Sequence, residues 1–429
     1  MKYKQYPSYR DSEVEWLGEI PEHWQLATVS RLFDIKAGGD VKKEYFSEEK
    51  SSDFPYPIYT NSTKKEAVYG YSKKAFFHEN TITVSGRGYI GYAIYREHKY
   101  DAIIRLLVLS PKRNKPCKFF MYYINDVLDF QVANTAISQL STEQISPYRL
   151  VLPPLQEQQT IANYLDTATA KIDTLIAKQT KLIELLKEKR QALISSAVTK
   201  GLDSSVAMKD SGVEWLGEIP EHWEVSRVKF HANIKGRIGF RGYTKEDLVE
   251  KEEGALVLGA SEMNNNAQVV LKSPQYITWH KYYESPEIIL KKNDILFVQR
   301  GSTVGKVAYI DYEIEEATIN PSLVVLKQIK LEEAYLKYFL MSDIIKSIVK
   351  VQTSNTAIPM ISQEQIGNYI LSKPHKTEQQ AIANYLDDKT SKIDTLISKS
   401  IKAIDLLKEK RTALISSAVT GKIDVREVE

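Results

Sequence analysis

The sequence predicts a mixed α/β protein in which two globular α/β domains are separated by two long antiparallel coiled-coil helices, with an approximate two-fold relation between the halves. Three observations lead to this prediction. Two segments recur along the chain, the second of them has the composition of a long helix, and the stretches between the repeats are rich in β-forming residues.

The first recurring segment is a short leader. Residues 11–29 and 210–228 match at 14 of 19 positions at an offset of 199, and both contain Val-Glu-Trp-Leu-Gly-Glu-Ile-Pro-Glu-His-Trp. The second is longer: residues 157–201 and 378–422 share 33 of 45 residues at an offset of 221. The extra 22 residues must lie between the repeats of the second half, where the two halves scarcely resemble each other. Each half is therefore a fixed frame that carries its own insert.

The second repeat predicts a long helix in each half. Residues 155–200 and 375–420 contain no Gly or Pro and are rich in Lys, Glu, Leu, Ile and Ala. Gly201 and Gly421 are expected to end these helices. Apolar residues recur three and four positions apart and should form the core between the two helices. These are Ile161, Leu165, Ile172, Leu175, Leu182, Leu186, Leu193, Ile382, Leu386, Ile393, Leu396, Leu407 and Leu414.

The inserts predict compact α/β domains. Short β-branched runs such as Thr81-Ile-Thr-Val and Ser322-Leu-Val-Val-Leu are separated by Gly, Asn, Ser and Pro. We expect a first domain with its leader over 1–152, a central helix over 153–201, a second domain with the repeated leader over 202–373, and a final helix over 374–429. The first helix should lead away from the first domain and the second should lead back, which makes the pair antiparallel.

Composition sets limits but does not identify a partner. The net charge is +3, residues 1–150 carry +3 and residues 211–370 carry −3, so any contact with nucleic acid must come from local patches. The single cysteine, Cys117, excludes an internal disulfide and a cysteine metal cluster. No apolar run is long enough to cross a bilayer, and the first residues have no apolar core. We expect a cytoplasmic protein that does not contact a membrane.

Near-motifs for enzymes do not predict a catalytic or metal site. Gly86-Arg-Gly-Tyr-Ile-Gly91 matches a dinucleotide-binding pattern, but a strand-like run follows where that pattern needs a helix. Gly301-Ser-Thr-Val-Gly-Lys306 resembles a phosphate-binding loop, but it is one residue short and has Val307 where a Ser or Thr should bind magnesium. The paired tryptophans, Trp16 with Trp24 and Trp215 with Trp223, favour a structural clasp.

The repeated motifs resemble those of the specificity subunits of type I restriction–modification systems. They are Trp16-Leu-Gly-Glu-Ile-Pro-Glu-His-Trp24, Asn-Thr-Ala-Ile at 134 and 355, Glu157-Gln-Gln-x-Ile161 and Lys-Glu-Lys-Arg-x-Ala-Leu-Ile-Ser-Ser-Ala-Val-Thr, and each occurs twice in order. The resemblance implies two target-recognition domains that bind a split, asymmetric sequence in double-stranded DNA. It also implies two methyltransferase subunits and restriction motor-nuclease subunits as partners. S-adenosylmethionine, ATP and magnesium would belong to those partners, and this chain alone would hold no cofactor and catalyse nothing.

Two other interpretations stay open at this stage. The chain could be the specificity partner of a fused nuclease–methylase, or a structural coiled-coil adaptor with two protein-binding heads. Divergent inserts within a fixed frame favour two DNA readers, because DNA can be recognised in independent half-sites. Basic residues beside glycine or tyrosine are the best candidates for contact with DNA. They are Lys42, Lys43, Lys64, Lys65, Lys73, Lys74 and Arg87 in the first insert, and Lys235, Arg237, Arg241, Arg300 and Lys306 in the second.

Overall fold

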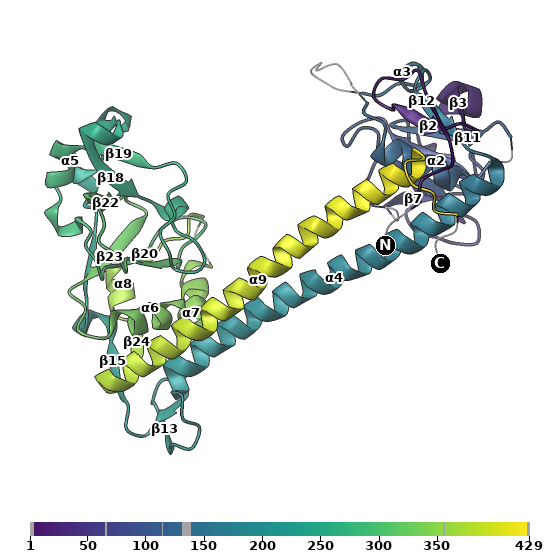
Figure 1. The fold of residues 1–429 in the computed structure, drawn as a ribbon. Helices are drawn as coiled ribbons and strands as arrows, with labels where there is room; N and C mark the ends of the chain where they lie inside the picture. The colour runs from purple at the N-terminus through teal and green to yellow at the C-terminus, as the bar shows by residue number, and fades with distance from the viewer. Residues whose placement is uncertain (1–3, 65–66, 114, 131–138, 355–356, 427–429) are drawn as a thin grey trace. The chain divides into compact units, whose positions relative to one another are not determined.

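The computed structural model describes residues 4–64, 67–113, 115–130, 139–354 and 357–426, and it confirms the mixed α/β fold with two long helices (Figure 1). Helix α4 (Leu155–Lys200) has 46 residues and α9 (Lys376–Val419) has 44. The chain forms two compact units, one of residues 1–180 with 401–429 and the other of residues 181–400. Each long helix therefore contributes one part to each unit.

The first unit contains two four-stranded sheets. One has the order β4-β11-β8-β9 and the other β10-β6-β7-β5, while β1 pairs with β2 and β3 pairs with β12. The strands are β1 (Tyr9–Asp11), β2 (Glu19–Pro21), β3 (Gln25–Thr28), β4 (Phe33–Ala37), β5 (Phe46–Ser47), β6 (Tyr56–Tyr59), β7 (Val68–Ser72), β8 (Thr81–Ser85), β9 (Ala93–Arg96), β10 (Asp101–Ala102), β11 (Leu106–Pro111) and β12 (Arg149–Leu152). The shorter helices are α1 (Val29–Leu32), α2 (Cys117–Asp126) and α3 (Thr142–Ile145).

The second unit also contains two four-stranded sheets. Their orders are β16-β23-β20-β21 and β17-β19-β18-β22, while β13 pairs with β14 and β15 pairs with β24. The strands are β13 (Met208–Asp210), β14 (Glu218–Pro220), β15 (Glu224–Arg227), β16 (Asn233–Gly236), β17 (Leu248–Val249), β18 (Gly254–Leu258), β19 (Gln275–Thr278), β20 (Ile295–Val298), β21 (Val307–Tyr309), β22 (Ala317–Ile319), β23 (Leu323–Lys327) and β24 (Ile370–Lys373). The shorter helices are α5 (Trp279–Tyr283), α6 (Glu333–Met341), α7 (Asp343–Thr353) and α8 (Gln363–Gly367).

The two units share one topology although their inserts differ in sequence. Antiparallel β4-β11-β8-β9 corresponds strand for strand to β16-β23-β20-β21. In the other sheet the parallel pair β10-β6 corresponds to β22-β18, and the antiparallel strands β7 and β5 correspond to β19 and β17. The connections differ: β6 and β7 are joined by residues 60–67, and β18 and β19 by the longer stretch 259–274. Part of the added length of the second half therefore lies in this connection, and another part lies between β19 and β20, which holds α5.

The buried face of each long helix follows alternating steps of four and three residues. In α4 these buried or half-buried positions are Gln158, Ala162, Leu165, Thr169, Ile172, Ile176, Gln179, Ile183, Leu186, Arg190, Leu193 and Ala197. Every one has a buried or half-buried counterpart 221 residues later in α9: Gln379, Ala383, Leu386, Thr390, Ile393, Ile397, Ser400, Ile404, Leu407, Arg411, Leu414 and Ala418. This is the heptad spacing of a coiled coil.

Three of the predicted helix-pair core residues do not lie on this face. Leu175, Leu182 and Leu396 are 47%, 42% and 48% exposed. The seam, which is the row of buried or half-buried positions given above, advances four residues from Ile172 to Ile176 and then continues through Ile183. The predicted row advanced only three residues, from Ile172 to Leu175, and therefore left the seam for the flank of the helix. The remaining predicted core residues are buried or half-buried: Ile161, Leu165, Ile172, Leu186, Leu193, Ile382, Leu386, Ile393, Leu407 and Leu414.

The helices run antiparallel within each unit. In the first unit the Arg411 Nε donates to Asp173 Oδ1 at 3.0 Å, while Arg426, beyond the end of α9, lies 3.9 Å from Glu157 near the start of α4. In the second unit Arg190 Nε donates to Asp394 Oδ1 at 3.0 Å, and Gly201 lies against Glu378 near the start of α9. Gly201 and Gly421 have φ of +75° and +78°, which explains why glycine ends each helix.

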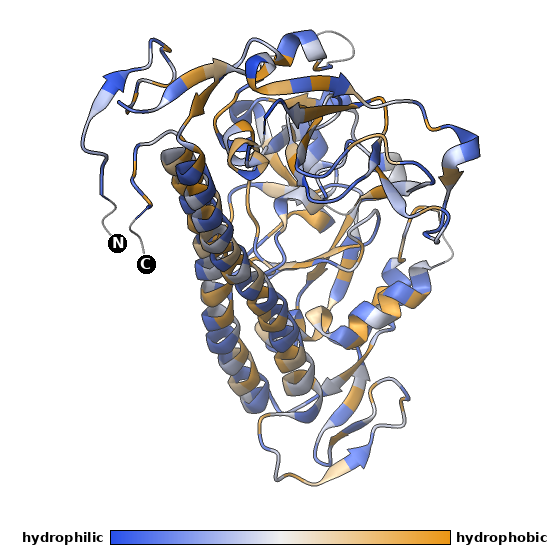
Figure 2. Ribbon diagram, turned by 90° about the vertical axis from the view of Figure 1, so that its right-hand side faces the viewer, coloured by the Kyte–Doolittle hydropathy of each residue, from blue (hydrophilic) through white to orange (hydrophobic). Residues whose placement is uncertain are grey.

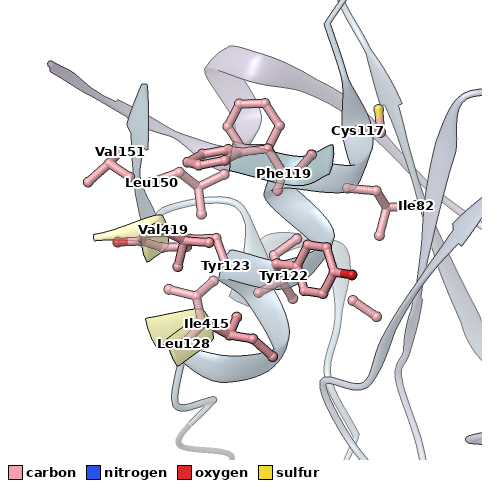
Figure 3. Packing of buried hydrophobic residues seen from close by; sticks show 14 of the residues in the cluster. Ile82, Cys117, Phe119, Tyr122, Tyr123, Leu128, Leu150, Val151, Ile415 and Val419 are labelled. Carbon is pink, nitrogen blue, oxygen red and sulfur yellow. The ribbon is translucent and has the colours of Figure 1, made fainter. Parts of the chain in front are cut away.

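Each unit has a hydrophobic core that includes its part of the long helices. In the first unit, Phe119 and Tyr123 of α2 pack with Leu150 and Val151 of β12 and with Val419 of α9 (Figure 3). Apolar and polar residues alternate along both long helices, as the colouring of Figure 2 shows. The frame is therefore part of each domain's core.

Candidate nucleic-acid interface

The two frames hold their leaders by the same contacts. In the first unit the buried Trp24 donates its indole N–H to Glu157 at 3.1 Å, and His23 Nε2 lies 2.9 Å from the same carboxylate. In the second unit Trp223 donates to Glu378 at 3.0 Å, and His222 lies 2.9 Å from it. These contacts join each leader to the start of a long helix.

The tryptophan prediction is right for only one member of each pair. Trp24 and Trp223 are 1% and 0% exposed, whereas Trp16 and Trp215 are 53% and 37% exposed. The buried pair forms the clasp because each indole N–H finds a carboxylate. Trp16 and Trp215 lie in a turn of the leader, and much of their surface lies in solvent.

Four predicted basic residues of the first insert lie together. Lys42 and Lys43 precede β5, Lys73 and Lys74 follow β7, and the pairing of β5 with β7 brings these segments side by side. The Lys73 backbone N–H donates to the carbonyl of Tyr45 at 3.0 Å, and all four lysine side chains are exposed. They form a basic patch at one edge of the β10-β6-β7-β5 sheet, which suits contact with phosphate.

The other first-insert candidates lie elsewhere. Lys64 is exposed in the connection between β6 and β7, and Lys65 lies outside the described residues. Arg87 follows β8, and its carbonyl accepts a hydrogen bond of 2.8 Å from Asn61 of the same connection. The structure therefore places Arg87 near Lys64's loop, away from the lysine patch.

Arg237 is an internal residue, which corrects its prediction as a contact with DNA. Its side chain is buried, Nε donates to the Ile319 carbonyl at 3.1 Å and a terminal nitrogen donates to Thr318 Oγ1 at 3.2 Å. A third bond of 3.3 Å reaches the carbonyl of Arg241, and burial lowers the pKa of the guanidinium. The sequence cannot separate a buried arginine that fixes a loop from an exposed one.

The other basic candidates of the second insert differ in whether their side chains already have partners within the chain. Lys235 on β16 is exposed. Arg241 lies 3.5 Å from Glu287, and the Lys306 ammonium donates to the Met263 carbonyl. Arg300 is exposed in the loop after β20, and its guanidinium has no hydrogen-bond or ion-pair partner within the described part of the chain.

The sequence reading missed an apolar flank on each part of the helix pair. The first unit exposes Leu175, Ile401 and Leu406, and the second exposes Leu182, Leu185 and Leu396. Two of these recur at the helix offset, Leu175 as Leu396 and Leu185 as Leu406. The signal was present in the sequence, since the heptad pattern leaves these leucines outside the seam.

The described residues hold neither a metal-binding cluster nor a membrane-spanning helix. They contain no group of three or more His, Cys, Asp or Glu side chains arranged to hold a metal ion. Within the same ranges, no helix is both long enough and apolar enough to cross a membrane. The first glycine-rich near-motif leads into β9, as the strand-like run after it predicts, and the second leads into β21.

Known proteins match this chain along most of its length. The family model described as "Type I restriction modification DNA specificity domain" matches residues 21–185 and 220–406. The MjaVIII specificity subunit of Methanocaldococcus jannaschii is 23% identical over 95% of both chains, and the putative MjaX specificity subunit of the same organism is 25% identical over 96% of both.

Solved structures agree on the fold. One, from work on complex assembly and conformational transition of the type I restriction–modification system, has a TM-score of 0.70 at 12% identity and covers 93% of this chain and 98% of its own. The HsdS subunit of Thermoanaerobacter tengcongensis has a TM-score of 0.53 at 13% identity and covers 94% and 98%. With two matches of the family model, one on each unit, the chain belongs to the family of type I restriction–modification specificity subunits.

Proposed function

We propose that this chain selects the DNA target of a type I restriction–modification complex, with each unit binding one half of a bipartite, asymmetric sequence. The observation that carries the proposal is the contrast within the duplicated structure. The clasp, the helix seam and the strand order are the same in both units, whereas the loops differ in length and sequence. Loops on a rigid scaffold are where recognition varies most readily.

We expect the helix pair to dock two methyltransferase subunits, which in turn support the restriction motor-nuclease subunits. The exposed leucines support this, because each unit carries such a flank on its part of the pair. One identical partner could therefore be bound twice. S-adenosylmethionine, ATP and magnesium would be bound by those partners, and we expect the chain alone to catalyse no reaction.

The test of recognition is an exchange of one insert. Cells that carry this chain and its methyltransferase should methylate one split motif, read by methylome sequencing. Replacing residues 36–132 with the insert of a relative should change one half-site and leave the other intact. A simultaneous change of both half-sites would contradict independent reading, and purified chain alone that methylates DNA would contradict the non-catalytic role.

The test of docking uses one apolar flank. Leu406→Asp should weaken co-purification of the methyltransferase, because an apolar contact is replaced by a charge. Lys408→Asn makes the same change of charge at an exposed position of the same helix, two residues along and so on the opposite face, and should leave co-purification intact. Equal recovery of the methyltransferase with both variants would show that this flank is not the docking surface.

A further inference from the structure

Two glycine-rich loops with different sequences occupy the same place in the two units. The first, residues 86–91, joins β8 to β9, and the second, residues 299–305, joins β20 to β21. Gly91 N–H donates to the Ser85 carbonyl at 2.8 Å, as Gly305 N–H donates to the Val298 carbonyl at 2.9 Å. Leu140 N–H donates to the Gly86 carbonyl and Ile361 N–H to the Gln299 carbonyl, each at 2.8 Å. The loops are therefore structural equivalents.

At equivalent positions, each loop contains an arginine followed by a glycine, Arg87-Gly88 in the first and Arg300-Gly301 in the second. Arg87 forms a β-bridge with Gln139, and Arg300 forms the same bridge with Met360. Glycine follows each arginine at positive φ, +75° at Gly88 and +106° at Gly301. The unmatched residues lie between this pair and the closing glycine, namely Tyr89-Ile90 in the first loop and Ser302-Thr303-Val304 in the second.

The paired arginines are available to an external ligand. Neither guanidinium has a hydrogen-bond or ion-pair partner among the residues that the structure describes, and Arg300 is exposed while Arg87 is half-exposed. Their backbone is fixed, since the Arg87 carbonyl accepts bonds from Asn61 and from Ser85, and the Arg300 backbone N–H donates to the Ser322 carbonyl at 3.2 Å. Such a donor loses little backbone freedom on binding.

The glycines beside the arginines face open space. A Cβ on Gly301 would meet nothing within 4 Å, and one on Gly88 would meet only the Asn61 side chain at 3.5 Å. The closing glycines differ, because a Cβ on Gly91 would lie 2.4 Å from Phe130 and one on Gly305 would lie 3.1 Å from Val349. Each loop therefore packs against its own unit at the closing glycine. The backbone at its Arg-Gly pair stays open, so an external ligand can come close to it.

We propose that Arg87 and Arg300 each bind a DNA phosphate, and that the unmatched residues after each Arg-Gly pair read the bases. The proposal rests on the function proposed above. The same arginine in two domains that read different sequences should contact what both half-sites share, which is the sugar–phosphate backbone. The residues that differ occupy the adjacent positions, and Tyr89, Ser302 and Thr303 are exposed there.

The first experiment measures binding of the chain, in complex with its methyltransferase subunits, to its own motif and to unrelated duplex DNA. Arg87→Gln and Arg300→Gln should each weaken binding to both duplexes by a similar factor, about tenfold. Each should also reduce the slope of log affinity against log salt by about one. Arg31→Gln, at an exposed position outside the loop, should change neither quantity.

The second experiment separates the roles within one loop. Replacing Tyr89-Ile90 with Ser-Thr-Val, the residues of the second loop, should alter the first half-site in the methylome and leave the second unchanged. Unchanged affinity in both arginine variants would overturn the phosphate assignment, as would a changed motif in either. An unchanged motif after the loop replacement would overturn the reading role. A wild-type complex with no preference for any sequence would instead overturn the function on which the proposal rests.

Discussion

Lengthening both long helices by one heptad should lengthen the spacer between the half-sites. Seven residues would be inserted after Thr180 in α4 and seven after Ser400 in α9, where the chain passes from one unit to the other. Because the buried face repeats every seven residues, the inserts can continue the seam through Ile176 and Ile183 and through Ile397 and Ile404. Both ion pairs across the seam, Asp173 with Arg411 and Arg190 with Asp394, stay within their own unit.

The size of the effect follows from helix geometry. Seven residues add about 10 Å at about 1.5 Å each, which is about three base pairs at about 3.4 Å. Seven added residues rotate one end of a straight helix against the other by two full turns to within about 20°, so the helix faces keep nearly the same direction. Three added base pairs rotate the second half-site about the DNA axis by about 100°. We therefore expect the same half-sites with a spacer about three base pairs longer, methylated more slowly because the second half-site is rotated on the duplex.

The assay is methylome sequencing of cells that carry the lengthened chain and its methyltransferase. Thermal unfolding and co-purification of the methyltransferase show whether the frame survives. Inserting seven residues in α4 alone is the control, since it offsets one helix against the other and should abolish methylation. An unchanged spacer with full methylation by the doubly lengthened chain would refute the idea that the helices set the separation.

Three further predictions concern stability. Glu157→Ala removes the acceptor of the Trp24 indole and should lower the free energy of unfolding by about 1–3 kcal/mol in urea titrations, and an unchanged midpoint would contradict the clasp. Arg237→Ala should also destabilise the chain by about 1–3 kcal/mol, and a variant of normal stability that has lost DNA affinity would return Arg237 to the interface. Burial raises the pKa of Asp126 to about 6, against an opposing effect of Arg411, so the folded chain holds this proton more tightly than the unfolded chain. The free energy of unfolding should therefore fall as the pH rises from about 4 to about 6, and Asp126→Asn should remove that fall in denaturant titrations at each pH.

The frame could be predicted because its determinants are local or periodic. Long runs without Gly or Pro predict the helices, and Gly201 and Gly421 mark their ends because only glycine adopts positive φ there at little cost. The duplication itself shows that one scaffold is used twice. The candidate basic residues could be nominated by type, since charge next to glycine is visible in the sequence, but their partners could not.

What the sequence left undetermined depends on contacts between distant residues. Leu175 and Ile176 are both apolar and adjacent, and only the packing of the helix pair decides that Ile176 faces the seam while Leu175 is exposed. Arg237 and Arg300 look equivalent in the sequence. The Ile319 carbonyl accepts a hydrogen bond from the Arg237 guanidinium, whereas the Arg300 guanidinium has no hydrogen-bond or ion-pair partner among the described residues.

The same reason explains why the common topology of the two inserts was not visible. A buried sheet position requires an apolar side chain of suitable shape, and several residue types meet that requirement. Sequence identity between the inserts can therefore be lost while the pattern of buried positions is kept. Ser85 and Val298, or Gly86 and Gln299, share no chemistry, but their backbones make the same hydrogen bonds. The sequence by itself determined the repeated scaffold, because helix propensity, the spacing of apolar residues and the terminal glycines act locally along the chain. Tertiary structure alone decided which residues of the divergent inserts correspond, because backbone hydrogen bonding between distant strands does not depend on side-chain identity.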